Sequence, residues 1–489
     1  MTTRLRLVLI SLTAALVAAL TFPIAATPNA EPLYAITGAH IFPVSSAPID
    51  NGTIVLRGGV IADVGANVTV PPDAVVIDGA GMNVYPGLID MGNDAPIDTG
   101  DPAAAQTGAR AGGGGGGRGG AATPTFATLE EAERAKRLQI LRPDYVAAEH
   151  LRTEGAELSA LASAGITTVL AVPGTGIFKG QSALVNVAVP PDDPQISAIA
   201  DYRQGLGVVK SPVATHINIA GRGAGQGYPG SLLGSIAFTR QGLTDAQWQR
   251  DAEATYTKLG SKGPRPAVEP ALDALRPALS REIPAAFDAS LAREIDRVLA
   301  MAAEFNLDPI VVGAAEAADR TSELQKAKAR VIFSLNFPTG RAGGAGAAGG
   351  GGGGRGGAAA APPTLAQLKA AQNAPKVPAA LVQANVPFAF TSGGLATAAE
   401  FVRNAGRVVK DGGLPADAVL RALTIDAARV AGAADRLGSL EKGKVANVVV
   451  TQGDILDGGT VKHVFVDGRP VDVEPPAAAG GGRGGRGGD

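Results

Sequence analysis

Short runs of strand-forming residues alternate with turn residues near the N-terminal end of the chain. Four runs are rich in β-branched and other apolar side chains: residues 34–42, 53–56, 60–64 and 74–77. Gly58 and Gly59 lie between the second and third runs. A tight hairpin turn needs positive φ angles, which glycine adopts without strain. The pattern therefore predicts short strands with a hairpin at this glycine pair.

The same pattern returns near the C-terminal end. Residues 446–450 and 461–466 are largely apolar and β-branched, and Asp467 and Gly468 follow the second run directly. Because Asp-Gly is a favoured hairpin turn, we expect a second hairpin here. Strands at both ends of the chain would then flank a different middle.

The middle of the chain alternates helix and strand periodicity. An amphipathic pattern predicts a helix capped by Ser290 that buries Leu291, Ile295, Val298, Leu299, Ala302 and Phe305. Strand-like residues 309–313, a helix over 315–328 and strand-like residues 331–335 follow. A helix between two buried strands predicts parallel pairing. Two further helix starts are marked by capping boxes, Thr128 with Glu131 and Thr364 with Gln367.

Length and composition allow one large domain and one small one. The chain has 489 residues, of which 45% are hydrophobic and 18% charged, so it can bury a sizeable core. The formal net charge is -2, which gives nucleic acid or an anionic membrane surface no electrostatic attraction to the whole protein. We therefore expect small or neutral partners.

The first thirty residues have the pattern of a secretory signal peptide. Arg4 and Arg6 precede the apolar residues 7–20, and small residues follow at Ala25, Ala26 and Ala30. The sequence contains no Cys, which excludes a lipid-modified cysteine, disulfides and a thiolate metal site. We expect residues 1–30 to be removed and the mature protein to be periplasmic or secreted, with no membrane association after cleavage.

Three segments are low in complexity: residues 112–120, 343–357 and 480–489. Their glycine content predicts disorder, because they bury too little side chain to offset the entropy of ordering. The two internal segments follow strand-like runs that end near Asp90 and Phe337. In a strand–helix barrel these positions lie on the face that carries active sites, so the glycine segments are expected to hang over it.

Several motifs resemble the amidohydrolase superfamily, and more closely its imidazolonepropionase-like branch. They are PGLID at residues 86–90, AGITTVLAV at 164–172, VPFAFTSGG at 386–394, and the strand-rich sequences at both chain ends. The resemblance implies an α/β fold, a distorted TIM (β/α)8 barrel with a small composite β-sandwich. Expected boundaries are 1–30 for the signal peptide, 31–84 and 436–474 for the sandwich, 85–435 for the barrel with insertions 111–121 and 341–361, and 475–489 for a disordered tail.

The resemblance also indicates where a metal would be held. Members of the family follow PGLID with His-x-His, and the two histidine positions here are Gly92 and Asp94. A later ligand histidine aligns with Gly313, and the final metal-binding or water-activating aspartate aligns with Gly393. Glycine has no ligand atom, whereas a catalytic metal needs about three protein ligands. We therefore expect no bound cofactor, although zinc or another divalent metal is the norm for the family.

Candidate pocket residues are Asp94, Asn93, Lys179, Gln181, His216 and Ser392. Each also has a structural explanation: Asp94 suits a turn, His216 a packed strand, and Lys179 with Gln181 a solvated loop. Ser392 has no His-Asp pair nearby in sequence, which weakens a nucleophilic role. If His216, Asp94 and Glu316 converge, a nonstandard metal site with three ligands is a further alternative.

Two functions remain open. The resemblance implies a hydrolase of non-peptide C–N bonds, with weak activity expected because the metal ligands are replaced. The alternative is a pseudoenzyme that binds a small-molecule ligand or a protein partner, as a homo-oligomer or paired with an active relative. Nucleic-acid binding through Arg118, Arg355, Arg483 and Arg486 is disfavoured, because these charges neutralise too few phosphates.

Overall fold

The computed structural model describes residues 33–98, 128–129, 140–152, 156–187, 207–219, 229, 231–338 and 363–473. Several sequence expectations lie outside these ranges. They are the signal peptide, residue 131 of the first capping box, the glycine-rich segments 112–120 and 343–357 with their flanking insertions, and the tail 475–489. The features below belong to the compact unit Leu33–Asp489.

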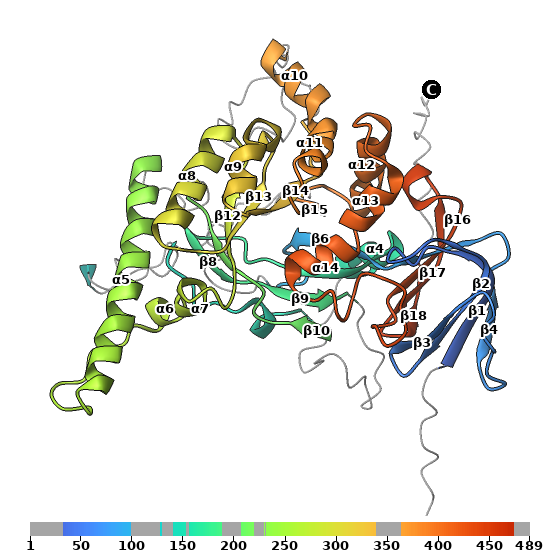
Figure 1. Ribbon diagram of the computed structural model, residues 1–489, viewed down its shortest axis with the longest axis horizontal. Coiled ribbons are helices and arrows are strands. Elements are labelled where there is room, and N and C mark those ends of the chain that lie inside the picture. The colour runs from blue at the N-terminus through green and yellow to red at the C-terminus, as the bar shows by residue number, and fades with distance from the viewer. Residues whose placement is uncertain are drawn as a thin grey trace, which may run out of the picture. The chain divides into compact units, whose positions relative to one another are not determined.

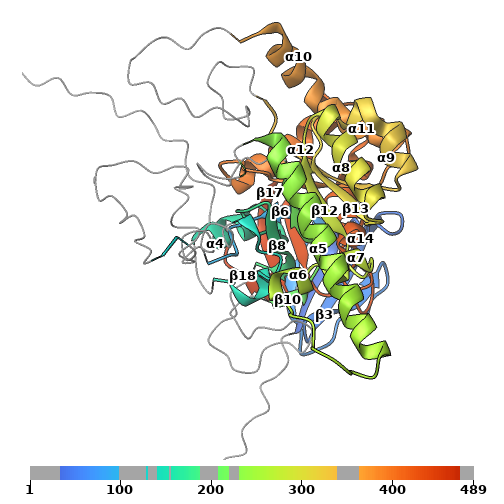
Figure 2. The ribbon, with the colours of Figure 1, turned by 90° about the vertical axis from the view of Figure 1, so that its left-hand side faces the viewer.

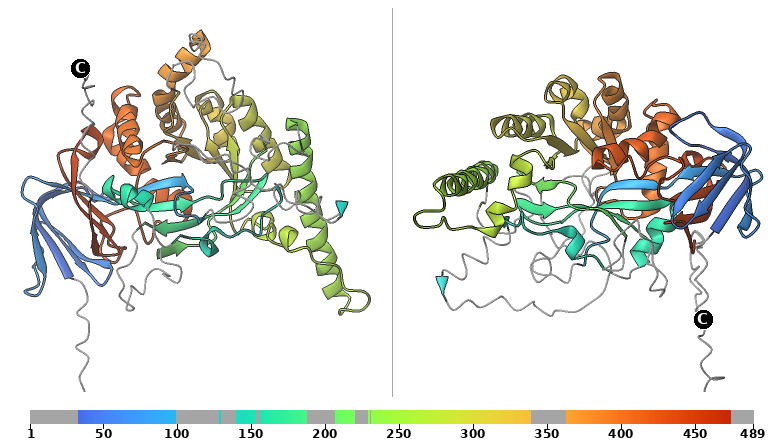
Figure 3. Two further views of the ribbon diagram at one scale, coloured as in Figure 1. Left: turned by 180° about the vertical axis from the view of Figure 1, so that it is seen from behind. Right: turned by 60° about the horizontal axis from the view of Figure 1, so that its bottom comes forward.

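One eight-stranded sheet combines strands from both ends of the chain (Figure 1). Its strand order is β18-β17-β16-β5-β1-β2-β3, and β4 pairs with β1. We call it the composite sheet; Figure 3 shows its early and late strands together from behind. The strands are β1 Leu33–Ile41, β2 Ile49–Arg57, β3 Val60–Gly65, β4 Val75–Asp78, β5 Asn83–Pro86, β16 Val448–Gln452, β17 Thr460–Val466 and β18 Arg469–Val471.

Both predicted hairpins are confirmed. Strands β2 and β3 pair antiparallel around Gly58 and Gly59, whose φ angles are 57° and 85°. Strands β17 and β18 pair antiparallel around Asp467 and Gly468, with φ angles of 50° and 70°. Positive φ at both central residues matches the twist of the flanking strands, which is why these dipeptides suit the turns.

The remaining strands and most helices form what we call the body. Its strands form a four-stranded sheet, β10-β9-β7-β6, and a six-stranded sheet, β15-β14-β13-β12-β11-β8. Each neighbouring pair from β11 to β15 is parallel, as predicted for residues 309–313 and 331–335. The strands are β6 Leu88–Asn93, β7 Ile166–Ala171, β8 Phe178–Gln181, β9 Ala183–Asn186, β10 Gly207–Lys210, β11 Thr215–Ile217, β12 Ala285–Ala289, β13 Pro309–Gly313, β14 Arg330–Ser334 and β15 Phe388–Thr391.

Helices connect and cover the strands of the body, and the longest of them, α5, is plain in Figure 2. Within the described ranges, none of the helices has the length and apolar content that a membrane span requires. Their bounds are η1 Ala147–Glu149, α4 Ala156–Ser163, α5 Leu232–Lys258, α6 Pro270–Asp273, α7 Arg276–Leu279, α8 Ala292–Glu304, η2 Ala317–Arg320, α9 Thr321–Lys326, α10 Leu365–Asn373, η3 Ala374–Lys376, α11 Val377–Gln383, α12 Ala398–Lys410, α13 Ala416–Ala422, α14 Ile425–Ala431 and η4 Ile455–Asp457.

Two helix boundaries differ from the sequence prediction. Helix α8 has Leu291 rather than Ser290 as its N-cap, because the Glu294 carboxylate accepts hydrogen bonds from the backbone N–H groups of both residues. The helix expected over residues 315–328 is divided into the 3-10 turn η2 and the short helix α9. By contrast, the capping box of Thr364 and Gln367 is present at the start of α10.

Side chains on the body strands alternate between two faces, as strand geometry requires. Ala286, Ile310, Ile332 and Ala389, one from each of β12 to β15, belong to one buried cluster with residues of β6, β7 and β9. We call the face that carries them the inner face. Phe287, Val311 and other intervening residues instead belong to the larger cluster that includes the buried sides of α8, α11 and α12.

Candidate functional site

The inner face continues past its apolar cluster to the carboxyl ends of the strands. Four residues each lie two positions after an inner-face residue of the same strand: Asp288, Val312, Ser334 and Thr391. The ladders that join β12 to β15 contain no register shifts. Alternation therefore places these side chains on the inner face too. In α/β folds, the carboxyl ends of parallel strands are where ligands bind, so this edge is the candidate site.

A charged pair crosses the inner face at this edge. The Nζ atom of Lys179 on β8 lies 2.5 Å from Oδ2 of Asp288 on β12. The two side chains are only 12% and 29% exposed. Strand β11 lies between β8 and β12, so the ion pair spans β11. A lysine and a carboxylate that are both mostly withdrawn from water need each other, because either charge alone would be poorly solvated.

His216 lies on the strand that the ion pair spans. It is 1% exposed and is paired in register with Gly180 of β8 and Ala286 of β12. Burial first, and then the positive charge of Lys179, lower the pKa of His216 to about 3, so the ring is neutral at physiological pH. Among the described residues, neither ring nitrogen has a hydrogen-bond partner. We call Lys179, His216 and Asp288 the strand-end cluster.

A buried acid, Asp90, ties β6 to β15. Its Oδ1 accepts hydrogen bonds from the backbone N–H of Ser392 at 2.9 Å and of Gly92 at 3.3 Å. The Asn93 side-chain amide donates to Oδ2 at 3.1 Å. Asp90 is fully buried, and this burial raises the pKa of its carboxyl group, although the hydrogen bonds act in the opposite direction. The carboxylate therefore holds two strand ends together.

The structure separates the residues proposed from sequence. Lys179 and His216 lie in the strand-end cluster. Asn93 and Ser392 lie at the same edge but are engaged with each other, at 3.3 Å, and with Asp90. Asp94 is exposed at the surface just beyond β6.

Gln181 does not join the cluster. Its amide donates to the carbonyl oxygens of Pro143 at 3.2 Å and Ala274 at 3.3 Å, on the side of the strand that faces the helices. Gln181 pairs with Thr215 of β11. Ala214 and His216, on either side of Thr215, face the inner side, so Thr215 faces away from it, as Gln181 does.

Sequence reasoning did not single out Asp90 or Asp288. Both carry the same signal: a lone aspartate inside an otherwise apolar strand run, LIDM and AAFDA respectively. A charged residue in such a run is costly unless it is paired or hydrogen-bonded. Either run could therefore have marked a buried carboxylate before the structure was known.

The glycines at the expected metal-ligand positions have a local structural fit. Gly313 and Gly393 adopt φ angles of +96° and +51°. A Cβ on Gly313 would lie 2.7 Å from the Ser290 hydroxyl, and one on Gly92 would lie 2.7 Å from the Thr391 hydroxyl. A Cβ on Gly393 would likewise collide with the Ser334 hydroxyl. Hydroxyl groups of neighbouring strands therefore fill the space that ligand side chains would need.

The donor set does not fit the divalent metal of the family. Among the described residues, no group of three or more His, Cys, Asp or Glu side chains is arranged to hold a metal ion. The alternative set of His216, Asp94 and Glu316 is not assembled: Asp94 is exposed, and the Glu316 carboxylate accepts a hydrogen bond from Ala292 N at 2.8 Å. We derive no reaction step through a metal at this edge.

Comparison with known proteins finds a family match over the C-terminal part of the chain. Residues 363–471 match the model of the amidohydrolase family. The chain carries an amidohydrolase-family domain. The region of this domain that matches the model begins just before α10 and ends in β18, so it includes Ser392 and Gly393 but not the strand-end cluster. No curated protein matches the sequence significantly.

Solved structures are also similar to this chain. The chain is similar to an amidohydrolase from Thermotoga maritima MSB8, with a TM-score of 0.68 and 20% identity over 90% of this chain and 99% of that one. It is also similar to a prolidase solved with N-methylphosphonate-L-proline, with a TM-score of 0.49 and 15% identity over 90% and 99% of the two chains. The first of these likenesses supports the mixed α/β fold.

Proposed function

We propose that this chain is an exported member of the imidazolonepropionase-like branch that binds a small polar molecule without the metal chemistry of the family. In this proposal the body is a distorted (β/α)8 barrel and the composite sheet is its β-sandwich. The strand order supports the barrel, since β8 and β9 are separated only by Ser182 and so link the two sheets. Hydrogen bonds from Ser392 N to Asp90 and from Thr391 Oγ1 to Gly92 O bring β15 back to β6.

The observation that carries the proposal is the fit of the glycines at the strand ends. A simple loss of ligands would leave backbone angles that a histidine or aspartate still tolerates. Gly313 instead has a φ angle of +96°, outside the left-handed helical region that Asp and His sometimes adopt, and the Ser290 hydroxyl occupies the adjoining space. At Gly393 the φ angle of +51° is one that aspartate tolerates, but the Ser334 hydroxyl occupies the space that its side chain would need. The edge is therefore built around the absence of these side chains.

The strand-end cluster offers a ligand specific polar contacts. An ammonium group has three donors, and the contact of Lys179 with Asp288 uses one of them. The neutral ring of His216 is buried beneath this ion pair, so it adjoins Lys179 and does not itself contact the ligand. The ammonium donors suit a small ligand with a carbonyl or carboxylate oxygen that approaches the strand ends.

A second candidate function, hydrolysis of non-peptide C–N bonds, is favoured by one observation. The imidazole of His216 has two nitrogens without hydrogen-bond partners among the described residues and lies next to a lysine, a pairing of groups used in general acid–base catalysis, although a pKa of about 3 makes this ring a weak base at neutral pH. In this case Lys179 would stabilise negative charge on a carbonyl oxygen.

Assays of amide, lactam and dipeptide hydrolysis distinguish the two candidates. We expect background rates for the unmodified protein, with and without added zinc. A rate above background that falls by about 100-fold or more in both Lys179→Met and His216→Phe, but not in the surface variant Asp251→Asn, would favour the hydrolase.

Export is tested separately. The N-terminal sequence pattern supports a mature chain that begins near Thr27 or Glu31 and is recovered outside the cytoplasm. Cell fractionation with intact-mass measurement checks this. A soluble cytoplasmic pool that retains Met1 would contradict export without affecting the binding proposal.

A further inference from the structure

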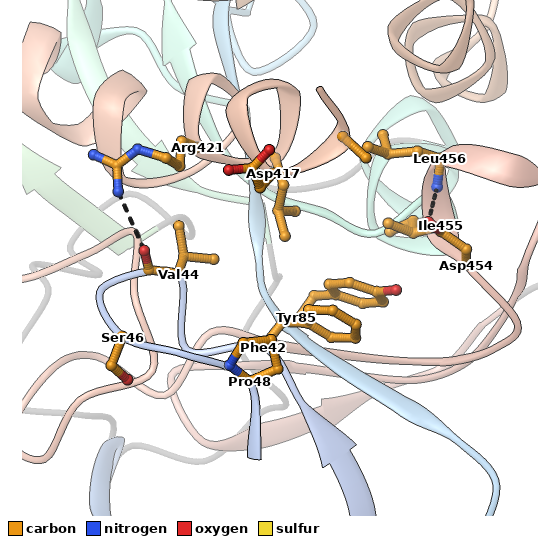
Figure 4. Close-up of a pocket in the computed structure, with 12 residues that line it drawn as sticks. Phe42, Val44, Ser46, Pro48, Tyr85, Asp417, Arg421, Asp454, Ile455 and Leu456 are labelled. Carbon is orange, nitrogen blue, oxygen red and sulfur yellow. Dashed lines mark hydrogen bonds between the residues drawn. The ribbon is translucent and has the colours of Figure 1, made fainter. Parts of the chain in front are cut away.

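A pocket of about 310 Å³ lies where the composite sheet meets the body (Figure 4). Its walls are the segment 42–48, Tyr85 of β5, one side of α13, and residues 454–456 at η4. The pocket shares no residue with the strand-end cluster. Its volume lies at the lower end of the range of about 300–1,000 Å³ that is typical of small-molecule sites.

Aromatic and aliphatic side chains form much of the lining. The rings of Phe42 and Tyr85 are stacked, with centroids 4.7 Å apart and planes inclined by 11°. Figure 4 shows the two rings along one side of the pocket. Leu420 and Ile455 add apolar surface. This lining suits a compact ligand with a flat or apolar body.

The charged residues around the pocket are predominantly acidic. Asp417 is exposed in the first turn of α13, and no ion pair of its carboxylate is found among the described residues. The Asp454 carboxylate accepts a hydrogen bond from Leu456 N at 2.8 Å through Oδ1. Arg421 also lines the pocket, and its Nη2 pairs with Asp426 at 3.3 Å, but Asp426 also pairs with Arg429, so the Arg421 charge is only partly offset. Two aspartates still face this one arginine. The charge left to a ligand is therefore negative.

One wall of the pocket is held in an uncommon backbone conformation. Val44 has a φ angle of 69°, which a β-branched residue rarely adopts. Nη1 of Arg421 donates a hydrogen bond to the Val44 carbonyl at 3.3 Å, and Phe42 N donates to Val84 O at 2.8 Å. These bonds fix the segment from both sides, so the pocket is formed before a ligand arrives, which reduces the entropy cost of binding.

We propose that this pocket binds a small organic cation, a positively charged nitrogen on an aromatic or aliphatic body. The body would pack against Leu420 and the half-buried ring of Phe42, which Tyr85 backs at 2% exposure, and the charge would lie near Asp417 and Asp454. Attraction between a cation and an aromatic face adds to the attraction of the carboxylates. The inference does not depend on the function proposed for the strand ends.

Isothermal titration calorimetry on the full mature protein tests the proposal with three related probes. Benzyltrimethylammonium is the cation, benzyl alcohol a neutral compound and phenylacetate an anion. We expect the cation to bind at least tenfold more tightly than either of the others. Equal affinity for all three probes, or no measurable binding of the cation at millimolar concentration, would overturn the proposal.

A matched pair of double variants locates the binding. Asp417→Asn with Asp454→Asn removes both charges, while asparagine keeps the capping role of residue 454. Asp245→Asn with Asp251→Asn removes two charges from α5, which contributes no residue to the pocket. Circular dichroism melting verifies that both fold. We expect about tenfold weaker cation binding in the first variant only; equal weakening in both would place the cation elsewhere and refute the site.

Discussion

Lys179 and Asp288 form an ion pair that crosses β11 and lies next to the buried ring of His216. The pair joins strands that are not neighbours in the sheet, and both side chains are largely withdrawn from water. In the function that we propose, this pair takes the place of the metal-centred arrangement that the family resemblance implies. The metal-free function that we propose depends on that replacement.

A double-mutant cycle measures the strength of this pair. Lys179→Met and Asp288→Asn should each lower the free energy of unfolding by about 1–3 kcal/mol, because each leaves a poorly solvated group unpaired. The double variant should cost less than the sum, with a coupling of about 1 kcal/mol or more, measured by urea denaturation.

The control cycle uses Arg240 and Glu304, an ion pair whose side chains are 50% and 42% exposed. An exposed pair typically contributes about 0–1 kcal/mol. If the coupling of Lys179 with Asp288 is no larger than that of the control pair, the ion pair is not protected from water as described.

Protonation of His216 should make the protein less stable in acid. The pKa of the folded state is about 3, lowered from 6.5, so between these values the unfolded chain binds a proton that the folded protein does not. Stability from this group is complete above pH 6.5 and is lost as the pH falls towards 3, at up to about 1.4 kcal/mol per pH unit.

The comparison that isolates this effect is unmodified protein against His216→Phe, by denaturation from pH 7.5 to 4.5. As the pH falls, the unfolding free energy of the unmodified protein should decrease relative to that of His216→Phe. A difference that stays constant with pH would show that the ring is accessible to protons in the folded state.

Asp467 should have the opposite pH dependence. It is 1% exposed in the turn between β17 and β18, where its Oδ1 accepts a hydrogen bond from Asn186 at 3.1 Å. Burial chiefly raises the pKa of Asp467 from 3.8 to about 6. A raised carboxyl pKa contributes stability below pH 3.8 that is lost as the pH rises through 6.

Asp467→Asn removes this titration while keeping the oxygen that accepts from Asn186. From pH 7 to pH 4, the unmodified protein should gain stability relative to the variant, by up to about 3 kcal/mol at 1.4 kcal/mol per pKa unit. Thermal melting across this range provides the measurement, and parallel curves for the two proteins would contradict the assignment.

Substitution of Gly313 tests whether the strand ends are built around glycine. Gly313→Ala should cost more stability than Gly413→Ala, because both have positive φ angles but only Gly313 has a side-chain atom, the Ser290 hydroxyl, within 3 Å of the added Cβ. The strain common to both is about 1–2 kcal/mol. Adding Ser290→Ala should recover the excess cost; equal losses at both glycines would mean that the space is open.

Local patterns predicted the elements that local residues determine. Gly58 with Gly59 and Asp467 with Gly468 mark their hairpins because turn conformation depends on the turn residues themselves. The parallel pairing of β13 and β14 followed from the intervening helix. The start of α8 was misplaced by one residue because the Glu294 carboxylate accepts the hydrogen bonds of the backbone N–H groups of Ser290 and Leu291 at the start of the helix.

The site was only partly accessible from sequence. Lys179 and His216 were candidates, but their partner Asp288 is distant in sequence, and no periodicity links it to them. The Gln181 side chain points towards Pro143 and Ala274 because of how the helices pack, and this packing is also determined by residues far apart in sequence. The motifs of the amidohydrolase resemblance placed Gly92, Gly313 and Gly393 at strand ends, and each lies within two residues of the end of a strand.

The metal content of the purified protein tests the central claim most directly. Mature protein incubated with zinc and then desalted should contain far less than one equivalent of zinc or any other transition metal by plasma mass spectrometry. The opposite result would be about one equivalent of metal per chain. Gly413→Ala would retain this metal, and Asp94→Ala or His216→Phe would lose it. That outcome would establish a metal site at the strand ends and contradict a metal-free function for this protein.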